Sequence, residues 1–199
     1  IMSIRRPAVA GKFYRSGASE LRAEVESCFL APGGPGRLPS RVSSEQLTVN
    51  SGPRKIVGLV SPHAGYLYSG SVAANAYNRL AQDGLPDIVL ILGPNHRSNE
   101  PPIALSDEDA WRTPLGDVPL DKALAHEIAA GCPEAGIDPR AHVEEHSLEV
   151  QLPFLQYIYG GMVKWSDGQM AEWSNGRMVK WSDGRMGHSH TPMLTANWG

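Results

Sequence analysis

The chain has 199 residues, of which 41% are hydrophobic and 20% charged, and its formal net charge at pH 7 is -3. This composition is ordinary for one globular α/β domain, and the negative charge argues against a nucleic-acid partner. No apolar run approaches the roughly 20 residues that span a membrane, no signal peptide is recognised, and the two cysteines lack CxxC spacing, so a cytoplasmic protein with reduced thiols is expected.

The first predicted elements are a helix, a long loop and a strand. Ser19 is expected to cap a helix whose apolar side chains recur at i, i+4, i+7 and i+8 from Leu21 onward. Residues 31–53 are rich in Pro, Gly and Ser, which predicts a loop. A short apolar strand is predicted over residues 55–60.

A second helix and two further strands follow. The helix is expected to begin at Ser69 or Ser71 and to end near Gly84. The next strand, 87–92, contains the continuous apolar run Ile-Val-Leu-Ile-Leu, and a shorter strand is predicted at 102–105. Continuous apolar runs are typical of parallel strands that are covered on both faces, so the two longer strands are expected to be parallel neighbours.

Two helices complete the predicted domain. One is expected over 121–130, and the other over 146–159, although Pro153 would interrupt a helix interior. The alternation of helices and strands predicts an α/β fold with a largely parallel central β-sheet flanked by helices.

The statistics of the chain change near Gly160. A repeat of eight residues, Met-x-x-Trp-Ser-Asp/Asn-Gly, follows three times, and its Asp-Gly and Asn-Gly pairs favour tight hairpin turns. Such a hairpin would set Trp165 opposite Met170. We therefore expect an α/β domain over 1–160 and a repeat tail over 161–199 that is poorly ordered or hairpin-like.

Each of the two longer predicted strands stops at a proline and is followed by a histidine. The first reads Leu59-Val-Ser-Pro-His63, and the second reads Ile91-Leu-Gly-Pro-Asn-His96. Neighbouring parallel strands bring their carboxyl ends to one edge of a sheet, where ligand sites form, so the two imidazoles are expected to meet there. Two neutral imidazoles suit a divalent transition metal. The alternative is that each histidine only caps its strand.

A third candidate cluster is the segment His142-Val-Glu-Glu-His-Ser-Leu-Glu149. If a helix begins near Glu145, then Glu145 and Glu149 share one face, and His146 lies beside Glu149. His146 is then a candidate proton shuttle whose tautomer is fixed by a carboxylate. The alternative is an exposed, charged helix start.

Five motifs in a fixed order resemble the Memo family, whose prokaryotic members are called AmmeMemoRadiSam system protein B. The resemblance covers about residues 4–160, and the motifs that carry it are Arg6-Pro-Ala-Val-Ala-Gly-Lys-Phe-Tyr14, Ser61-Pro-His-Ala-Gly-Tyr-Leu-Tyr-Ser-Gly70, Leu92-Gly-Pro-Asn-His96, Trp111-Arg-Thr-Pro-Leu-Gly116 and Glu145-His-Ser-Leu-Glu-Val-Gln-Leu-Pro-Phe154. The resemblance implies a fold like that of the class III extradiol dioxygenases, with a metal pocket at one edge of the sheet.

The resemblance also implies roles for residues. Iron or copper is the implied metal, with His63 and His96 as its ligands and with His146 and Tyr68 as catalytic residues. The candidate substrate-binding residues are Phe13, Tyr14, Tyr66 and Asn95, which would hold a small molecule or a peptide.

The chain departs from the family after residue 160. Family members continue with further strands and helices, which carry an Asp/His motif and a cysteine as the third ligand; Cys28 and Cys132 are not placed to replace it. A truncated domain with an unpaired sheet edge, prone to self-association, is therefore expected. The functions to distinguish are a metal-dependent redox enzyme of the dioxygenase type, a non-catalytic metal- or peptide-binding adaptor, and an inactive fragment.

Overall fold

The computed structural model describes most of the chain up to residue 160 and four strands beyond it. The described residues are 2–39, 55–84, 86, 88–96 and 101–160, together with the backbone of the strands at 163–164, 170–174, 177–181 and 193–198. These residues form a mixed α/β fold with four α-helices and three small sheets. No helix among them is both long enough and apolar enough to cross a membrane.

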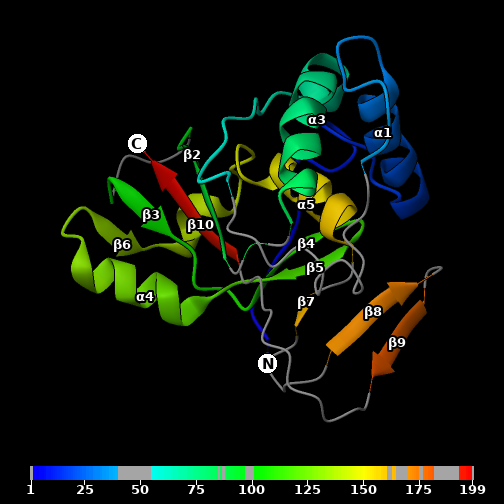
Figure 1. Ribbon diagram of the computed structural model, residues 1–199. Coiled ribbons are helices and arrows are strands. Elements are labelled where there is room, and N and C mark those ends of the chain that lie inside the picture. Colours follow the sequence, from blue (N-terminus) through cyan, green and yellow to red (C-terminus); the bar gives the residue numbers. More distant parts are fainter. Residues whose placement is uncertain are drawn as a thin grey trace.

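Three helices pack around the main core. They are α1 (Ala18–Leu30), α3 (Tyr66–Gln82) and α5 (Leu152–Tyr159). Figure 1 shows α1 and α3 side by side above α5. The ring of Phe154 stacks on Tyr77 at a centroid distance of 4.9 Å and meets the edge of Phe29 at 5.9 Å. The apolar stripe that the sequence predicted for α1 is the face it buries in this core.

Two helices begin earlier than the sequence predicted. Gly17, not Ser19, precedes the first turn of α1, and α3 begins directly after Gly65. Gly70 lies where α3 crosses α1, and a Cβ atom at this position would overlap the Sγ atom of Cys28. The glycine therefore allows the two helices to approach closely.

The helix α4 (Lys122–Gly131) provides a test of local stability. The carboxylate of Asp121 accepts a hydrogen bond from the backbone N–H of Leu124 at 2.9 Å and caps the helix. We expect Asp121→Ala to lower the free energy of unfolding by about 1 kcal/mol, whereas Asp121→Asn should stay within a few tenths of wild type. Urea denaturation checks this, and equal losses in both variants would contradict a capping role.

Pro153 does not interrupt a helix. A 3-10 turn, η2 (Glu149–Gln151), leads into α5, and Pro153 lies in the first turn of that helix. Backbone N–H groups in a first turn have no partner within the helix, so a proline costs nothing there. The helix expected over 146–159 therefore begins at Leu152.

The structure does not confirm the largely parallel central sheet. One sheet has the order β1 (Ile4–Arg5), β4 (Ala110–Thr113), β5 (Gly116–Pro119), and the second has the order β2 (Val89–Pro94), β10 (Met193–Trp198), β3 (Ile103–Leu105), β6 (Ala135–Ile137). In the second sheet β10 runs parallel to β2 and antiparallel to β3, and β3 is parallel to β6. In the first sheet β1 is parallel to β4, and β4 is antiparallel to β5. Both sheets are therefore small and mixed.

The strand predicted over 55–60 is absent, which corrects the expectation of two neighbouring strands. The backbone N–H groups of Lys55 and Ile56 donate to the carboxylate of Asp83, at 3.1 and 2.9 Å, rather than to a sheet ladder. The segment leads from there to His63 without a strand partner.

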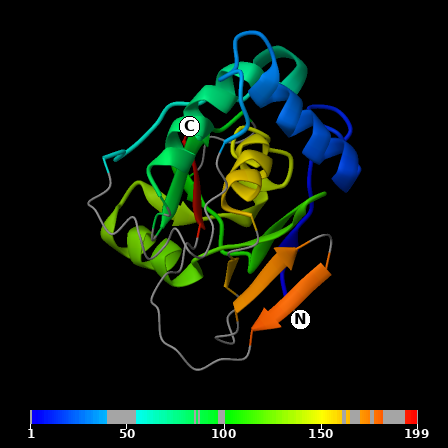
Figure 2. The ribbon, with the colours of Figure 1, turned by 45° about the vertical axis from the view of Figure 1, so that its right-hand side comes forward.

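The repeat region forms a third sheet from β7 (Val163–Lys164), β8 (Met170–Ser174) and β9 (Arg177–Trp181), all antiparallel. Lys164 pairs with Met170, so the expected pairing of Trp165 with Met170 is wrong by one residue. Figure 2 shows β8 and β9 as a hairpin that lies apart from α1 and α3.

Candidate metal centre

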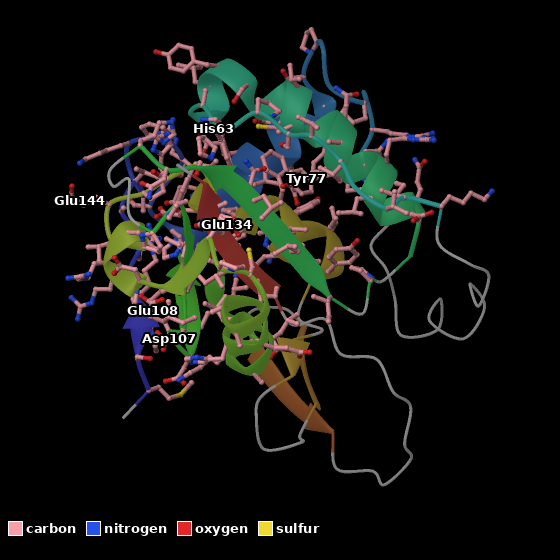
Figure 3. The ribbon with its side chains drawn as sticks, turned by 90° about the vertical axis from the view of Figure 1, so that its left-hand side faces the viewer. His63, Tyr77, Asp107, Glu108, Glu134 and Glu144 are labelled. Atoms are coloured by element: carbon pink, nitrogen blue, oxygen red, sulfur yellow. The ribbon has the colours of Figure 1, made fainter. Side chains whose placement is uncertain are left out.

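Three histidines from separate parts of the chain gather at one place. His63 lies just before α3, His96 follows β2, and His146 lies before η2. The ring centroids are 5.4 Å apart for His63 and His96, 5.8 Å for His63 and His146, and 4.8 Å for His96 and His146. One nitrogen from each ring lies within 4.8 Å of the other two. Figure 3 shows His63 beside the start of α3.

The two proline turns are held by the segment that carries the third histidine. The carbonyl of Pro62 accepts a hydrogen bond from Nε2 of Gln151 at 3.2 Å, and the carbonyl of Pro94 accepts one from the hydroxyl of Ser147 at 3.0 Å. His63 and His96 therefore meet because both turns bind the lead-in to α5, and not because their carrier segments are neighbouring strands.

The buried carboxylate of Glu145 contacts the ring of His96. Oε1 of Glu145 lies 2.9 Å from Nδ1 of His96 and accepts the backbone N–H groups of His146 and Ser147, while Oε2 accepts the backbone N–H of His96. Burial alone would raise the pKa of this carboxyl, but the hydrogen bonds from Ser147, His96 and His146 lower it to about 2. The carboxylate is charged at neutral pH and favours a proton on Nδ1 of His96, which leaves Nε2 of that ring for a metal.

Glu149 faces away from the histidines, contrary to the expectation that it shares a face with Glu145. Its carboxylate accepts hydrogen bonds from Arg5 at 2.5 Å, from the hydroxyl of Tyr14 at 2.6 Å, and from the backbone N–H groups of Ala8 and Val9. In the sequence both glutamates lie near His146, and the path of the turn between them determines which one contacts a histidine ring. The spacing did not identify Glu145 as the residue that contacts the ring of His96.

The other expected site residues divide between a pocket and the core. A pocket of about 570 Å³ beside the histidines is lined by Lys12, Phe13, Pro62, His63, Ala64, Gly65, Tyr68 and His146. The ring of Phe13 lies 4.6 Å from that of His146, and Tyr68 is 82% exposed at the pocket. Tyr14 and Tyr66 are instead buried, and Tyr66 donates to the carbonyl of Val150 at 2.7 Å. Asn95 is partly buried next to His96.

The donor set fits a transition-metal ion. Imidazole nitrogen suits zinc, copper, iron and nickel. Nitrogen atoms bound to one ion at about 2 Å are roughly 3 to 4 Å apart, so the present spacing of up to 4.8 Å needs a closure of about 1 Å. Small rotations of the partly exposed rings of His63 and His146 would supply this closure. An ion held by three imidazoles would have further coordination positions for a ligand.

A buried histidine in the segment that leads to His146 gives a pH dependence. His142 is fully buried, with Trp111 against its ring at 5.3 Å, and burial together with the charge of Arg5 lowers its pKa to about 4. In the unfolded chain a histidine titrates near 6.5, so the stabilising effect is complete above pH 6.5 and is lost as pH falls toward 4.

We therefore expect the wild-type protein to lose about 2 kcal/mol of unfolding free energy between pH 7.5 and pH 5 from this residue. His142→Gln should remove that part of the slope, although the variant is less stable at pH 7.5. Denaturant unfolding at both pH values checks this, and the same slope in both proteins would contradict it.

The comparisons with known proteins agree with the motifs. A family model described as Memo-like protein matches residues 5–165. The chain belongs to the Memo family. The MEMO1 family protein of Methanopyrus kandleri is 48% identical to this Memo chain over 156 residues, which are 78% of this chain and 52% of the relative. The MEMO1 family protein of Sulfurisphaera tokodaii is 43% identical over 161 residues, which are 81% of this chain and 55% of that protein.

The matched region of the Memo chain contains His63, His96 and His146, together with Glu145. The family expected from the five motifs is thereby confirmed. The chain spans about half the length of the curated relatives that it matches.

Proposed function

We propose that this Memo-family chain binds a divalent transition metal, iron or copper, through His63, His96 and His146, and exposes the ion to a small-molecule ligand for redox chemistry of the dioxygenase type. The observation that carries the proposal is the approach of the three imidazole nitrogens to within 4.8 Å, with a buried carboxylate behind one of them. In this proposal His146, which the sequence analysis expected to be a catalytic residue, is the third ligand, a role that the family resemblance assigned to a cysteine.

Each residue around the centre has a separate task in this proposal. Held by His63, His96 and His146, iron or copper would supply redox chemistry toward oxygen and an organic ligand. Glu145 orients the ring of His96, and the ring of Phe13 packs against that of His146 at 4.6 Å. The phenol of Tyr68 lies at the pocket, where it can hydrogen-bond a ligand.

The charge of the pocket indicates the kind of ligand. Lys12 is a lining residue, and no carboxylate is among the described residues that line the pocket. A bound cation would add further positive charge. We therefore expect the ligand to be an anion, although the chain as a whole carries a net charge of -3.

Elemental analysis of purified protein tests the metal site. We expect about one ion per wild-type chain and less than about a tenth of that in the His63→Ala/His96→Ala variant, because two of three ligands are lost. His126→Ala is the matched control, since His126 lies on α4 and pairs with Asp107 at 3.5 Å. Equal metal content in the double variant and the wild type would refute the site, and oxygen uptake by the iron- or copper-loaded wild type, absent in the double variant, tests the redox step.

Exposed side chains favour a second candidate, a peptide-binding adaptor. Leu67 and Tyr68 are adjacent and both strongly exposed at the start of α3. Aromatic and apolar side chains of this kind act as anchors for partner segments. Peptide binding that survives removal of the metal by a chelator would favour the adaptor over the redox protein.

A further inference from the structure

The buried side chain of Gln151 joins the core to the turn that carries His63. Its Nε2 atom donates to the carbonyls of Pro62 and Ser147, both at 3.2 Å, and its Oε1 atom accepts the hydroxyl of Tyr77 at 2.6 Å. Exchanging the amide oxygen and nitrogen would set the oxygen against two carbonyl oxygens, which have no proton to donate. The orientation of this amide is therefore fixed, and with it the hydrogen bond to Pro62.

Tyr77 anchors the amide to the core. Its ring is nearly parallel to that of Phe154, at an interplanar angle of 3° and a centroid distance of 4.9 Å. Its hydroxyl also hydrogen-bonds the side chain of Ser61, at the start of the turn. Figure 3 shows His63 near the start of α3 and Tyr77 further along this helix. The packed ring therefore holds one hydroxyl between the turn and the amide.

A different set of contacts holds the other two histidines. Glu145 accepts the backbone N–H groups of His96 and His146, and its Oε1 atom lies 2.9 Å from Nδ1 of His96. The two rings are stacked at a centroid distance of 4.8 Å and an interplanar angle of 15°. They therefore form one unit, and the hydrogen bond from Gln151 connects the turn of His63 to the segment that carries this unit.

We propose that Gln151 and Tyr77 are positioning residues of the metal centre: Tyr77 orients the amide of Gln151, and the amide sets the distance of His63 from the other two rings. Neither residue is among the described residues that line the pocket, so both act through the carbonyl of Pro62 and not by touching a ligand. The spacing is critical because ligand nitrogens up to 4.8 Å apart already need to close by about 1 Å on one ion. The inference rests on the metal site proposed above and adds two residues that hold it in place.

NMR of the metal-free protein tests the ring positions in Gln151→Met. Methionine fills a similar volume but lacks the N–H donors of the amide. We expect the cross-peaks from the ring protons of His63 to those of His96 and His146 to lose most of their intensity, because the turn is released. The cross-peak between His96 and His146, whose ring centroids are 4.8 Å apart, should remain.

Gln156→Met is the matched control. Gln156 is also a bridging glutamine, since its Oε1 atom accepts the hydroxyl of Thr113 at 2.6 Å and its Nε2 atom donates to the carbonyl of Gly116 at 3.1 Å. These partners belong to β4 and β5 and not to a histidine turn. The control variant therefore loses a comparable bridge and should keep all three histidine cross-peaks.

Tyr77→Phe removes the anchoring hydroxyl and keeps the stacked ring. We expect the same two cross-peaks of His63 to weaken, by less than in Gln151→Met. Tyr159→Phe is its control, because it loses a hydroxyl that donates to the carbonyl of Gly84 at 3.3 Å, and it should leave the cross-peaks unchanged. Competition with a chelator should show metal binding roughly tenfold weaker in Gln151→Met, with wild-type affinity in both controls.

Unchanged cross-peaks of His63 or wild-type metal affinity in Gln151→Met would overturn the proposal. An equal loss of the cross-peak between His96 and His146 would do the same, because it would show a general loosening of the region. If Gln151→Met does not fold, Tyr77→Phe decides between the same outcomes. The ring positions are measured without metal, so a wild-type protein that binds no ion would refute the metal site, while the cross-peaks still decide whether Gln151 positions His63.

Discussion

Glu149→Gln is expected to lower the free energy of unfolding by about 3 to 5 kcal/mol, because it leaves the guanidinium of Arg5 buried without its counter-charge. Both side chains are almost completely buried, and Nη1 of Arg5 lies 2.5 Å from Oε2 of Glu149. Urea denaturation at pH 7 measures the loss.

The surroundings of the pair explain the size of the effect. Arg5 also donates to the carbonyls of His142 and Glu145 at 2.7 and 2.5 Å, and its guanidinium lies 4.2 Å from the ring centre of Trp111. The same carboxylate holds Tyr14, whose hydroxyl pKa is raised by burial and by the adjacent negative charge. One substitution therefore disturbs the contact between the N-terminal segment and the lead-in to α5.

Two further variants separate charge from packing. Glu144→Gln, at an exposed position one residue before Glu145, should stay within about 0.5 kcal/mol of wild type. Arg5→Met combined with Glu149→Met should recover the part of the loss that comes from the unpaired guanidinium, whereas Tyr14 and the backbone N–H groups of Ala8 and Val9 still lose their acceptor. A loss below about 1 kcal/mol for Glu149→Gln would contradict a structural role for the pair.

Glu145→Gln is expected to weaken metal binding by roughly 10- to 100-fold, the usual effect of losing a carboxylate that orients a histidine ligand. The glutamate accepts four hydrogen bonds through its two oxygens, three of them from backbone N–H groups. A glutamine has only one oxygen, so at least one of these donors loses its acceptor.

Competition with a chromophoric chelator measures the affinity, and Glu144→Gln again serves as the control, with wild-type affinity expected. Nitrogen NMR of the imidazoles provides a readout that a general loss of stability would not mimic. In wild-type protein His96 should carry its proton on Nδ1, and the proton should be distributed between both ring nitrogens in Glu145→Gln. Wild-type affinity in Glu145→Gln would show that the carboxylate does not orient the ligand.

The sequence predicted the helices better than the sheet. The apolar spacing in α1 and the helix predicted over 121–130 rest on local signals, and both correspond to elements of the structure. The segment 55–60 has the composition of a strand, but a strand exists only when a partner offers its hydrogen bonds, and here Asp83 takes the first two amides. The strand β10 could not be predicted because its partners lie far away in the chain.

The candidate site shows the same division between local and distant information. The Pro-His spacing singled out His63 and His96, and their rings lie together. The reason differs from the expected one, since Gln151 and Ser147 bind the two proline carbonyls. The choice between Glu145 and Glu149 as the partner of a histidine depends on the path of one turn, which periodicity does not encode.

The three imidazoles come from segments that are far apart in the chain, and this has a consequence for the assembly of the fold. An ion shared by His63, His96 and His146 would act as a cross-link that closes two long loops at once. An unfolded chain offers no such preformed cage, so the free energy of binding would add to the stability of the native state. Metal binding and folding would then form one thermodynamic cycle, and the melting temperature would rise with the concentration of free metal.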